Sequence, residues 1–228
     1  IPLVPPADPV SIYAQSLLES LHLGEMKTED LDGAVTLVGA VCEVLLTNRK
    51  IRQVLGTILQ ISEPIMERIV TGSVLAVILG KQMGFESPRF LGRIAVSAFL
   101  REIGLGLISK DLVSEELLDL PKESQEKFMQ HPILGSQLLD QIRGIPTEIV
   151  QAVAQFHERC DGTGYPQKLK RPQITTIAKI LTLADAAYQD VFSQKPKWDN
   201  LSSFLLSVKS SKSEIFDREI LARLKLPS

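Results

Sequence analysis

The stretch Phe-His-Glu-Arg-Cys-Asp-Gly-Thr-Gly-Tyr-Pro occupies residues 156–166 and joins an apolar run to a polar loop. The apolar run, from Ile149 to Phe156, is typical of a scaffold helix that packs on a core. The loop behind it holds two glycines, a proline, a histidine and two carboxylates, the groups that such a helix delivers to a pocket. An ordinary surface turn is the alternative, because Asp-Gly and Thr-Gly are common turn dipeptides and Pro166 ends the element.

This stretch also carries a family resemblance. It resembles the signature of the HD-GYP family, a branch of the HD superfamily of metal-dependent phosphohydrolases whose members cleave the bacterial second messenger cyclic di-GMP. The family motif His-His-Glu-Arg-x-Asp-Gly-x-Gly-Tyr-Pro is matched at every defined position except the first, where Phe156 stands. The resemblance covers roughly residues 64–198. Its other elements are His131-Pro132 with Gly135, the basic loop Lys168-Leu169-Lys170, Ile174 and the Ala184-Asp185 pair.

The sequence departs from the family pattern at most of the metal-binding positions. Arg101 and Glu102 stand where the family has its name-giving histidine and aspartate, and an earlier family histidine falls near Arg68. Further departures are Pro64 for a glutamate, Phe156 for the first of two adjacent histidines, Leu105 for a lysine and Tyr188 for an aspartate. The resemblance therefore leaves Arg101 and Glu102 as vestiges of the catalytic pair. The metal ligands that remain are His131, His157 and Asp185.

The loss of ligands bears on the metal content. Intact family members hold two or three metal ions, which lower the pKa of a bridging water and clamp the phosphate oxygens. Two histidines and one carboxylate suffice for one divalent iron or zinc if they converge. The resemblance, however, assigns His131 and His157 to one metal and Asp185 mainly to its neighbour. We therefore expect no tightly bound metal cluster, and iron or manganese if an ion binds at all.

An arginine can replace a lost metal ion. A buried Asp185 without its metal would cost on the order of 3 to 5 kcal/mol unless a cation took the place of the ion. The guanidinium of Arg101 is always charged and can bind a carboxylate through two hydrogen bonds. We therefore hypothesise a buried ion pair between Arg101 and Asp185 in the former metal site. In the alternative, Arg101 extends to solvent at a helix C-terminus, where its charge is favoured.

The Gly-Tyr-Pro loop is a candidate ligand-binding element even without metal ions. Its basic residues, with Lys170 and Arg171 among them, can attract phosphate, and the ring of Tyr165 can stack on a base. The resemblance implies that Lys195-Pro196 corresponds to the family's Arg-Pro, which handles substrate phosphate. A solvated basic loop is the plainer alternative. The candidate ligand-binding residues are Asp161, Gly162, Gly164, Tyr165, Pro166, Lys168 and Lys195.

Each histidine also has a structural interpretation. His22 lies between two leucines, far from the motif, and is expected to be a structural or surface residue. His131 precedes a proline and could cap a helix. His157, next to Glu158, could be a hydrogen-bonded anchor of the loop. The placement of His131 and His157 in the family pattern favours descent from a metal site, without establishing present catalysis.

The composition indicates a globular chain without a nucleic-acid surface. The chain has 228 residues, of which 44% are hydrophobic, so it can bury one large core or two modest ones. Its 25 basic and 27 acidic residues give a net charge of -2, which predicts no binding to a nucleic-acid polymer. Cys42 and Cys160 lack the spacing of a disulfide framework or a zinc site and fit a reducing cytosol. The most apolar stretch, residues 69–80, is shorter than the roughly 20 residues that a bilayer needs, so we expect no membrane insertion.

Helical patterns run through nearly the whole sequence, and no alternation is long enough to require a sheet. We predict an all-α fold with an HD-domain-like helical bundle at residues 64–228 and an N-terminal helical extension at residues 1–63. Val35, Val38 and Leu45 of the extension would pack against the bundle or a second copy, so a homodimer is one expectation. The absence of a secretory signal and of an initiator methionine indicates a part of a longer protein. The predicted helices span 9–23, 28–48, 49–60, 64–84, 88–104, 114–120, 122–130, 133–142, 146–156, 174–190, 201–210 and 213–224.

These points together predict an HD-GYP-like module of bacterial cyclic di-GMP signalling that has lost catalytic activity. It would act in the cytoplasm by binding a partner signalling protein or cyclic di-GMP itself. The alternative is an active cyclic di-GMP phosphodiesterase with a reduced metal site of His131, His157 and Asp185. Glu102 would then serve as a substitute ligand, because carboxylates also bind these metals.

Overall fold

The computed structural model describes residues 9–22, 29–113, 120–192, 199–211 and 214–225. Within these ranges the fold is all-α, as predicted, and contains no strand apart from an isolated bridge between Asp161 and Lys170. Short 3-10 turns, η1 (Ile103–Leu107) and η3 (Arg171–Gln173), and a π-helical turn, η4 (Tyr188–Phe192), connect the helices. The α-helices are α1 (Pro9–His22), α2 (Glu29–Leu46), α3 (Arg49–Ile61), α4 (Glu63–Gln82), α5 (Pro88–Leu100), α6 (Lys110–Val113), α7 (Lys122–Phe128), α8 (His131–Asp140), α9 (Thr147–Gln155), α10 (Thr176–Ala187), α11 (Asp199–Ser210) and α12 (Arg218–Arg223).

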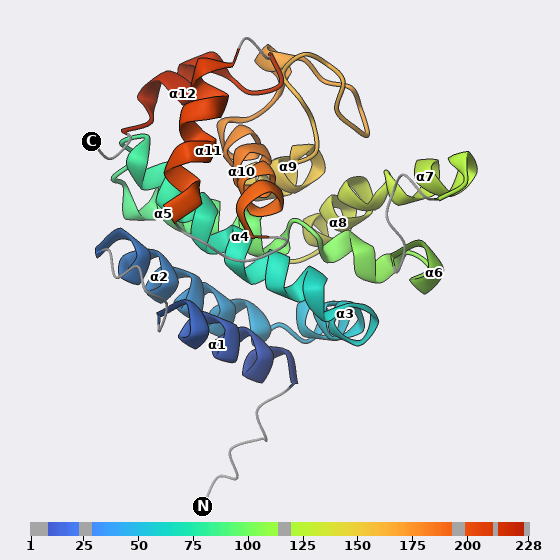
Figure 1. Cartoon of the computed structure of the whole chain (residues 1–228). Coiled ribbons are helices and arrows are strands. Elements are labelled where there is room, and N and C mark those ends of the chain that lie inside the picture. The colour runs from blue at the N-terminus through green and yellow to red at the C-terminus, as the bar shows by residue number, and fades with distance from the viewer. Residues whose placement is uncertain (1–8, 23–28, 114–119, 193–198, 212–213, 226–228) are drawn as a thin grey trace, which may run out of the picture.

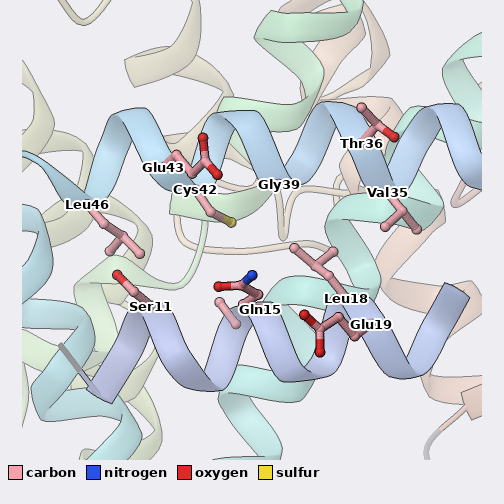
Figure 2. Close-up of a pocket in the computed structure, with 11 residues that line it drawn as sticks. Ser11, Gln15, Leu18, Glu19, Val35, Thr36, Gly39, Cys42, Glu43 and Leu46 are labelled. Carbon is pink, nitrogen blue, oxygen red and sulfur yellow. The ribbon is translucent and has the colours of Figure 1, made fainter. Parts of the chain in front are cut away.

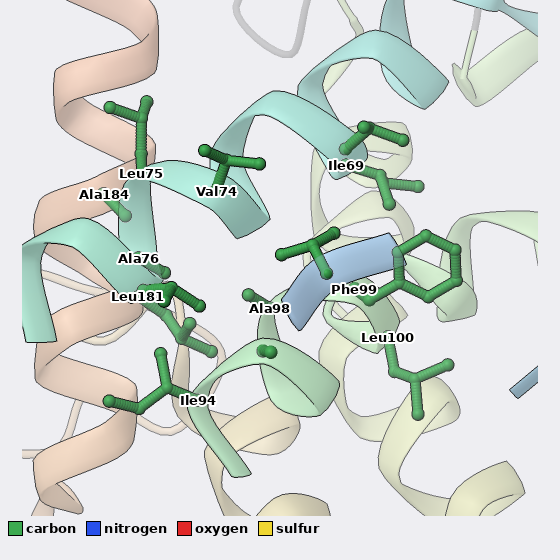
Figure 3. Packing of buried hydrophobic residues seen from close by; sticks show 14 of the residues in the cluster. Ile69, Val74, Leu75, Ala76, Ile94, Ala98, Phe99, Leu100, Leu181 and Ala184 are labelled. Carbon is green, nitrogen blue, oxygen red and sulfur yellow. The ribbon is translucent and has the colours of Figure 1, made fainter. Parts of the chain in front are cut away.

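Helix α4 is the centre of the bundle. Its residues from Ile69 to Gly80 are all buried, because α2, α5 and α10 pack around it (Figure 1). Figure 3 shows side chains of α4, α5 and α10 meeting in this core, among them Val74, Ile94 and Leu181. A Cβ added at Gly80 would lie 2.8 Å from Ile94 Cδ1, so the glycine lets α4 and α5 approach closely. The most apolar stretch of the sequence is therefore a buried helix, as expected.

The N-terminal helices pack on this bundle. α1 and α2 lie side by side and both contact α4, while α3 contacts α4 and η1. Val35, Val38 and Leu45 of α2 are buried within the chain itself, which confirms the expected packing against the bundle. The expected homodimer stays a prediction, and so does the domain boundary after residue 63. That boundary falls where a single residue, Ser62, separates α3 from α4.

The described helices include no single helix that is both long and apolar enough to cross a bilayer. Leu31–Leu46 and Arg49–Ile61 meet the requirement only when the two are counted together, and a bend of 112° separates them.

The predicted helix starts at Arg49, Pro88 and Lys122 agree with the structure, whether or not a side chain caps the helix. Asn48 accepts backbone N–H groups at the start of α3, and Thr175 does the same for α10. The helix predicted to end at Gly104 ends earlier, at Leu100, because the chain turns there and continues as η1. The helix predicted at 213–224 is limited to α12, whose first turn is capped by the side chain of Asp217. The helix predicted at 114–120 lies almost entirely outside the described residues.

Candidate functional site

The candidate site lies where α4, α8, α10, the end of α9 and the turn after α5 meet. Gly104 explains why the turn comes so close to α8. A Cβ at this position would overlap the backbone carbonyl of His131, so only a glycine fits. This contact brings the Glu102 side chain beside the His131 ring, although 29 positions separate the two residues in the sequence numbering.

Three ligand atoms converge in this site. One carboxylate oxygen of Glu102 and one ring nitrogen each of His131 and His157 all lie within 4.8 Å of one another. His131 Nε2 is 3.3 Å from Glu102 Oε2. Those two atoms and His157 Nε2 are buried without a hydrogen-bond partner among the described residues. Because buried polar atoms without partners are costly, their convergence indicates a site for a ligand.

The tautomer of His131 supports metal binding. Its Nδ1 lies 2.9 Å from the backbone carbonyl oxygen of Phe128. A carbonyl oxygen can only accept, so Nδ1 carries the hydrogen, and in the neutral ring Nε2 presents a lone pair to the site. Metal-binding histidines are commonly oriented by such a bond to a backbone carbonyl. For His157, burial lowers the pKa well below its ordinary value, which favours the neutral ring at this residue.

Asp185 has different partners. Its Oδ1 lies 3.9 Å from Arg101 Nη2 and 4.0 Å from Arg68 Nε, while its Oδ2 accepts a hydrogen bond of 3.1 Å from Gln189 Nε2. The structure therefore brings together two of the three expected metal ligands, His131 and His157. The third residue of the group is Glu102 and not Asp185. Burial raises the pKa of Asp185, and the two guanidinium groups oppose that effect.

Arg101 is buried, with only 2% of its side chain exposed. The alternative in which it extends to solvent is therefore wrong. The expected ion pair with Asp185 is present, but at 3.9 Å it lacks the two direct hydrogen bonds of a bidentate pair. The guanidinium instead donates to the carbonyl oxygens of Ala98 and Arg68, both at 2.7 Å. Gly72 makes room for it, since a Cβ there would lie 2.5 Å from Arg101 Nη2.

Arg68 has a role that the sequence did not reveal. Its Nη2 donates to Glu102 Oε1 at 2.6 Å, and this carboxylate is fully buried. Although burial raises the pKa of Glu102, the charge of Arg68 holds it well below the ordinary value. Two arginines and two carboxylates thus balance in charge before any ion binds. The residues fit one divalent ion at Glu102, His131 and His157, but the described residues offer no second group of three ligands for the cluster expected of intact family members.

The Gly-Tyr-Pro loop is fixed by Glu158, a buried carboxylate that accepts the backbone N–H groups of Gln167 at 2.7 Å and Leu169 at 2.8 Å. Asp161 accepts both the N–H and the hydroxyl of Thr163 at the outer turn. Both the pocket and the surface-turn interpretations are therefore partly right. The loop is a turn, and a buried carboxylate holds it against the site.

A cavity of about 530 Å³ opens beside this loop. The ring of Tyr165 forms part of its wall and stacks on His157 with ring centroids 4.5 Å apart. The sequence analysis missed Arg159 and Gln189, whose side chains line the same cavity. The lining residues are Met129, Phe156, His157, Arg159, Thr163, Gly164, Tyr165, Thr182, Asp185, Ala186, Gln189, Ile215 and Phe216.

Four other predicted ligand-binding residues, all of them described, do not line this cavity. Gly162 adopts φ 83°, which a glycine tolerates, and Lys168 adopts φ 55° with its side chain exposed. Asp161 and Pro166 belong to the loop but are also absent from the lining. Lys195 lies outside the described residues.

Comparison with known proteins identifies a family and several relatives. The model of the HD domain family matches residues 53–220, which is more than half of the chain. The chain is 29% identical over 126 residues to the cyclic di-GMP phosphodiesterase PA4108 of Pseudomonas aeruginosa, a match that covers 54% of this chain and 29% of that protein. It is 26% identical over 154 residues to the cyclic di-GMP phosphodiesterase PdeB of Borreliella burgdorferi, covering 67% and 40% of the two chains.

Two further similarities complete the comparison. A cyclic di-GMP phosphodiesterase of Thermotoga maritima is 28% identical over 153 residues, covering 65% of this chain and 40% of that protein. The matches thus span well under two thirds of the length of these relatives. The solved structure of Bd1817, an HDG"Y"P protein from Bdellovibrio bacteriovorus, superposes with a TM-score of 0.58 at 16% identity, covering 92% of this chain and 76% of that one. The fold, the Gly-Tyr-Pro loop and the family match lead to one conclusion: this chain belongs to the HD domain family, as an HD-GYP member.

Proposed function

We propose that this chain is a catalytically impaired HD-GYP module of bacterial cyclic di-GMP signalling, which acts in the cytosol by binding cyclic di-GMP or a partner protein. One observation carries the proposal. Asp185 faces the guanidinium groups of Arg101 and Arg68 at 3.9 and 4.0 Å, where a second metal ion would need a free carboxylate.

Hydrolysis of a phosphodiester by two metals needs ions about 3.5–4 Å apart that stabilise both the attacking and the leaving oxygen. The described residues supply one group of three ligands, and the remaining carboxylate is paired with arginines. A guanidinium can attract a phosphate, but it cannot lower the pKa of a bound water as a metal ion does. The expected result is a site that retains affinity for phosphate and has lost most of its hydrolytic power.

The cavity beside the loop has the chemistry that a nucleotide requires. Phe156, Tyr165 and Phe216 form apolar, aromatic parts of its wall, and Arg159 contributes a positive charge. Aromatic rings favour bases and arginines favour phosphates. The names of the three relatives, all cyclic di-GMP phosphodiesterases, support cyclic di-GMP as the first nucleotide to test.

Calorimetry with cyclic di-GMP, run together with chromatography of the nucleotide, tests the proposal. We expect binding without turnover. Arg159→Ala should weaken binding about tenfold through the loss of one charged hydrogen bond. Lys122→Ala, which removes the same charge from exposed helix α7, should leave binding unchanged. Repeated turnover that stops with chelator would contradict catalytic impairment, and the absence of heat would restrict the function to binding of a partner protein.

A second candidate function is a phosphodiesterase that works with a single metal ion. The convergence of Glu102, His131 and His157 favours it, since two histidines and one carboxylate suit iron or manganese. When bound, the ion would supply Lewis acidity at this position. Metal analysis of protein reconstituted with ferrous iron or manganese should give one ion per chain at most. His131→Ala should abolish that binding and Asp185→Asn should retain it, whereas two or more tightly held ions would contradict the assignment of Asp185 to the arginines.

A further inference from the structure

A second cavity lies between α1 and α2, and all its lining residues precede the residues that match the HD domain family. It has a volume of about 480 Å³, within the range of about 300–1,000 Å³ that is common for ligand sites. Figure 2 shows that the two antiparallel helices form its long walls. We call this cavity the α1–α2 groove. The proposed nucleotide function does not use it.

The floor of the groove is apolar. Ala14 and Leu18 come from α1, and Val35, Cys42 and Leu46 come from α2. Gly39 also lines the groove, and a Cβ there would reach Leu18 only at an ordinary contact distance of 3.8 Å. The glycine therefore leaves open a volume that a large side chain would fill.

The rim of the groove is acidic. Glu19 and Glu43 are exposed, and Figure 2 shows them on opposite helices, toward opposite ends of the groove. Neither carboxylate forms an ion pair with a described residue, and no lysine or arginine within the described ranges lines the groove. Two uncompensated negative charges around an apolar floor complement a ligand with an apolar centre and a positive charge on each side.

We propose that the α1–α2 groove binds a basic amphipathic segment of a partner protein. A helix of this kind presents aliphatic side chains at i, i+3 and i+4, with lysines or arginines beside them. Its aliphatic side chains would enter beside Gly39, and its basic side chains would pair with Glu19 and Glu43.

A second copy of this chain is a less suitable occupant. The exposed large apolar residues that a copy offers among the described residues are Ile12, Val44, Leu107 and Leu206. Pairing of the same face of two copies through Ile12 and Val44 would bring the acidic rims together, and their like charges would oppose it. Leu206 on α11 has a basic neighbour, because it lies three residues before Lys209. Insertion of α11 into the groove would join two different surfaces, and such a contact extends into open assemblies unless its rotation closes a ring. Sedimentation of the chain alone tests this occupant directly.

The probe for the groove is a fluorescein-labelled model peptide with leucines at helical spacing and lysines at its other positions, followed by fluorescence anisotropy. Its control is the same peptide with glutamate for every lysine. We expect the lysine peptide to bind more tightly than the glutamate peptide, with an affinity that falls as salt rises. Equal binding of both peptides, or of neither, would overturn the proposal.

Variants then locate the binding. Gly39→Leu should fill the groove and weaken binding at least tenfold, while thermal unfolding shows that the variant still folds. Glu19→Lys with Glu43→Lys should reverse the preference between the two peptides. Glu86→Lys with Glu126→Lys makes the same change in net charge at exposed positions outside the groove and should have little effect. Equal effects of the two charge reversals would overturn the proposal, as would self-association that Gly39→Leu abolishes, because a second copy would then be the occupant.

Discussion

Removal of the Arg101 charge should show how much the ion pair with Asp185 contributes to the stability of the fold. The closest atoms of the two groups are 3.9 Å apart, and both side chains are almost completely buried. At this distance and an effective dielectric constant of about 20, two unit charges attract each other by about 4 kcal/mol. Arg101→Met removes the charge and keeps much of the volume, whereas Asp185→Asn removes the opposite charge. Each single variant should lose up to about 3–5 kcal/mol of unfolding free energy, because it leaves a buried charge with only its second, similarly distant partner, Arg68 for Asp185 and Glu102 for Arg101.

The interaction itself is measured by the double variant. Arg101→Met also breaks the hydrogen bonds to two backbone carbonyls, but this loss occurs in both the single and the double variant and cancels in a double-mutant cycle. Because Arg68 still lies 4.0 Å from Asp185, the coupling should be below the full Coulomb value, at about 2–3 kcal/mol. Urea unfolding followed by circular dichroism gives all four free energies. A coupling below about 0.5 kcal/mol would refute the ion pair.

Three further predictions concern Gly72 and Glu158 at the site and Asp217 at the start of α12. Gly72→Ala should destabilise the protein by about 1–3 kcal/mol, because its Cβ meets a buried guanidinium that hydrogen bonds to two backbone carbonyls hold in place. Gly92→Ala, with nothing within 4 Å of its Cβ, should be neutral or stabilising in thermal unfolding. Glu158→Gln should cost about 1–3 kcal/mol and speed hydrogen exchange at the loop amides that the carboxylate accepts; unchanged exchange would contradict its anchoring role. Although burial raises the pKa of Asp217, hydrogen bonds from Lys179 and from backbone N–H groups hold it below its ordinary value. This stabilisation should be present above about pH 4 and lost as pH falls through the folded-state pKa, so Asp217→Asn should flatten the acid side of the stability profile.

The sequence predicted those parts of the site that a continuous motif carries. The Gly-Tyr-Pro loop and its connection to His157 follow from residues that are close in the chain. The pairing of Arg101 with Asp185 was predictable because a buried carboxylate needs a cation and the family pattern put both residues at one centre. The distance of 3.9 Å could not be predicted, since it depends on the carbonyl oxygens that hold the guanidinium.

Pairings between side chains of distant helices were harder to predict from the sequence. Arg68 and Glu102 are 34 residues apart, and the family pattern identified Arg68 only as a residue unable to bind metal. One signal was available, because Arg68 and Arg101 both replace family histidines and both therefore point at the same centre. Gly72 also had a signal as a glycine inside an apolar helix, where a close approach of another group is a common reason. The side chain that approaches it could be identified only from the fold.

The charge balance of the site determines how the fold depends on metal. In a centre built from carboxylates and histidines alone, the buried negative charges require ions, and metal binding becomes part of the folding free energy. Here Arg68 and Arg101 already neutralise Glu102 and Asp185, so the core is charge-balanced without an ion. An ion bound to the three ligands would then stabilise the protein only by mass action, in proportion to the logarithm of its concentration over its dissociation constant. Chelated protein should therefore keep its fold and its buried ion pairs, and a collapse of stability on chelation would show that the arginines do not replace the metal.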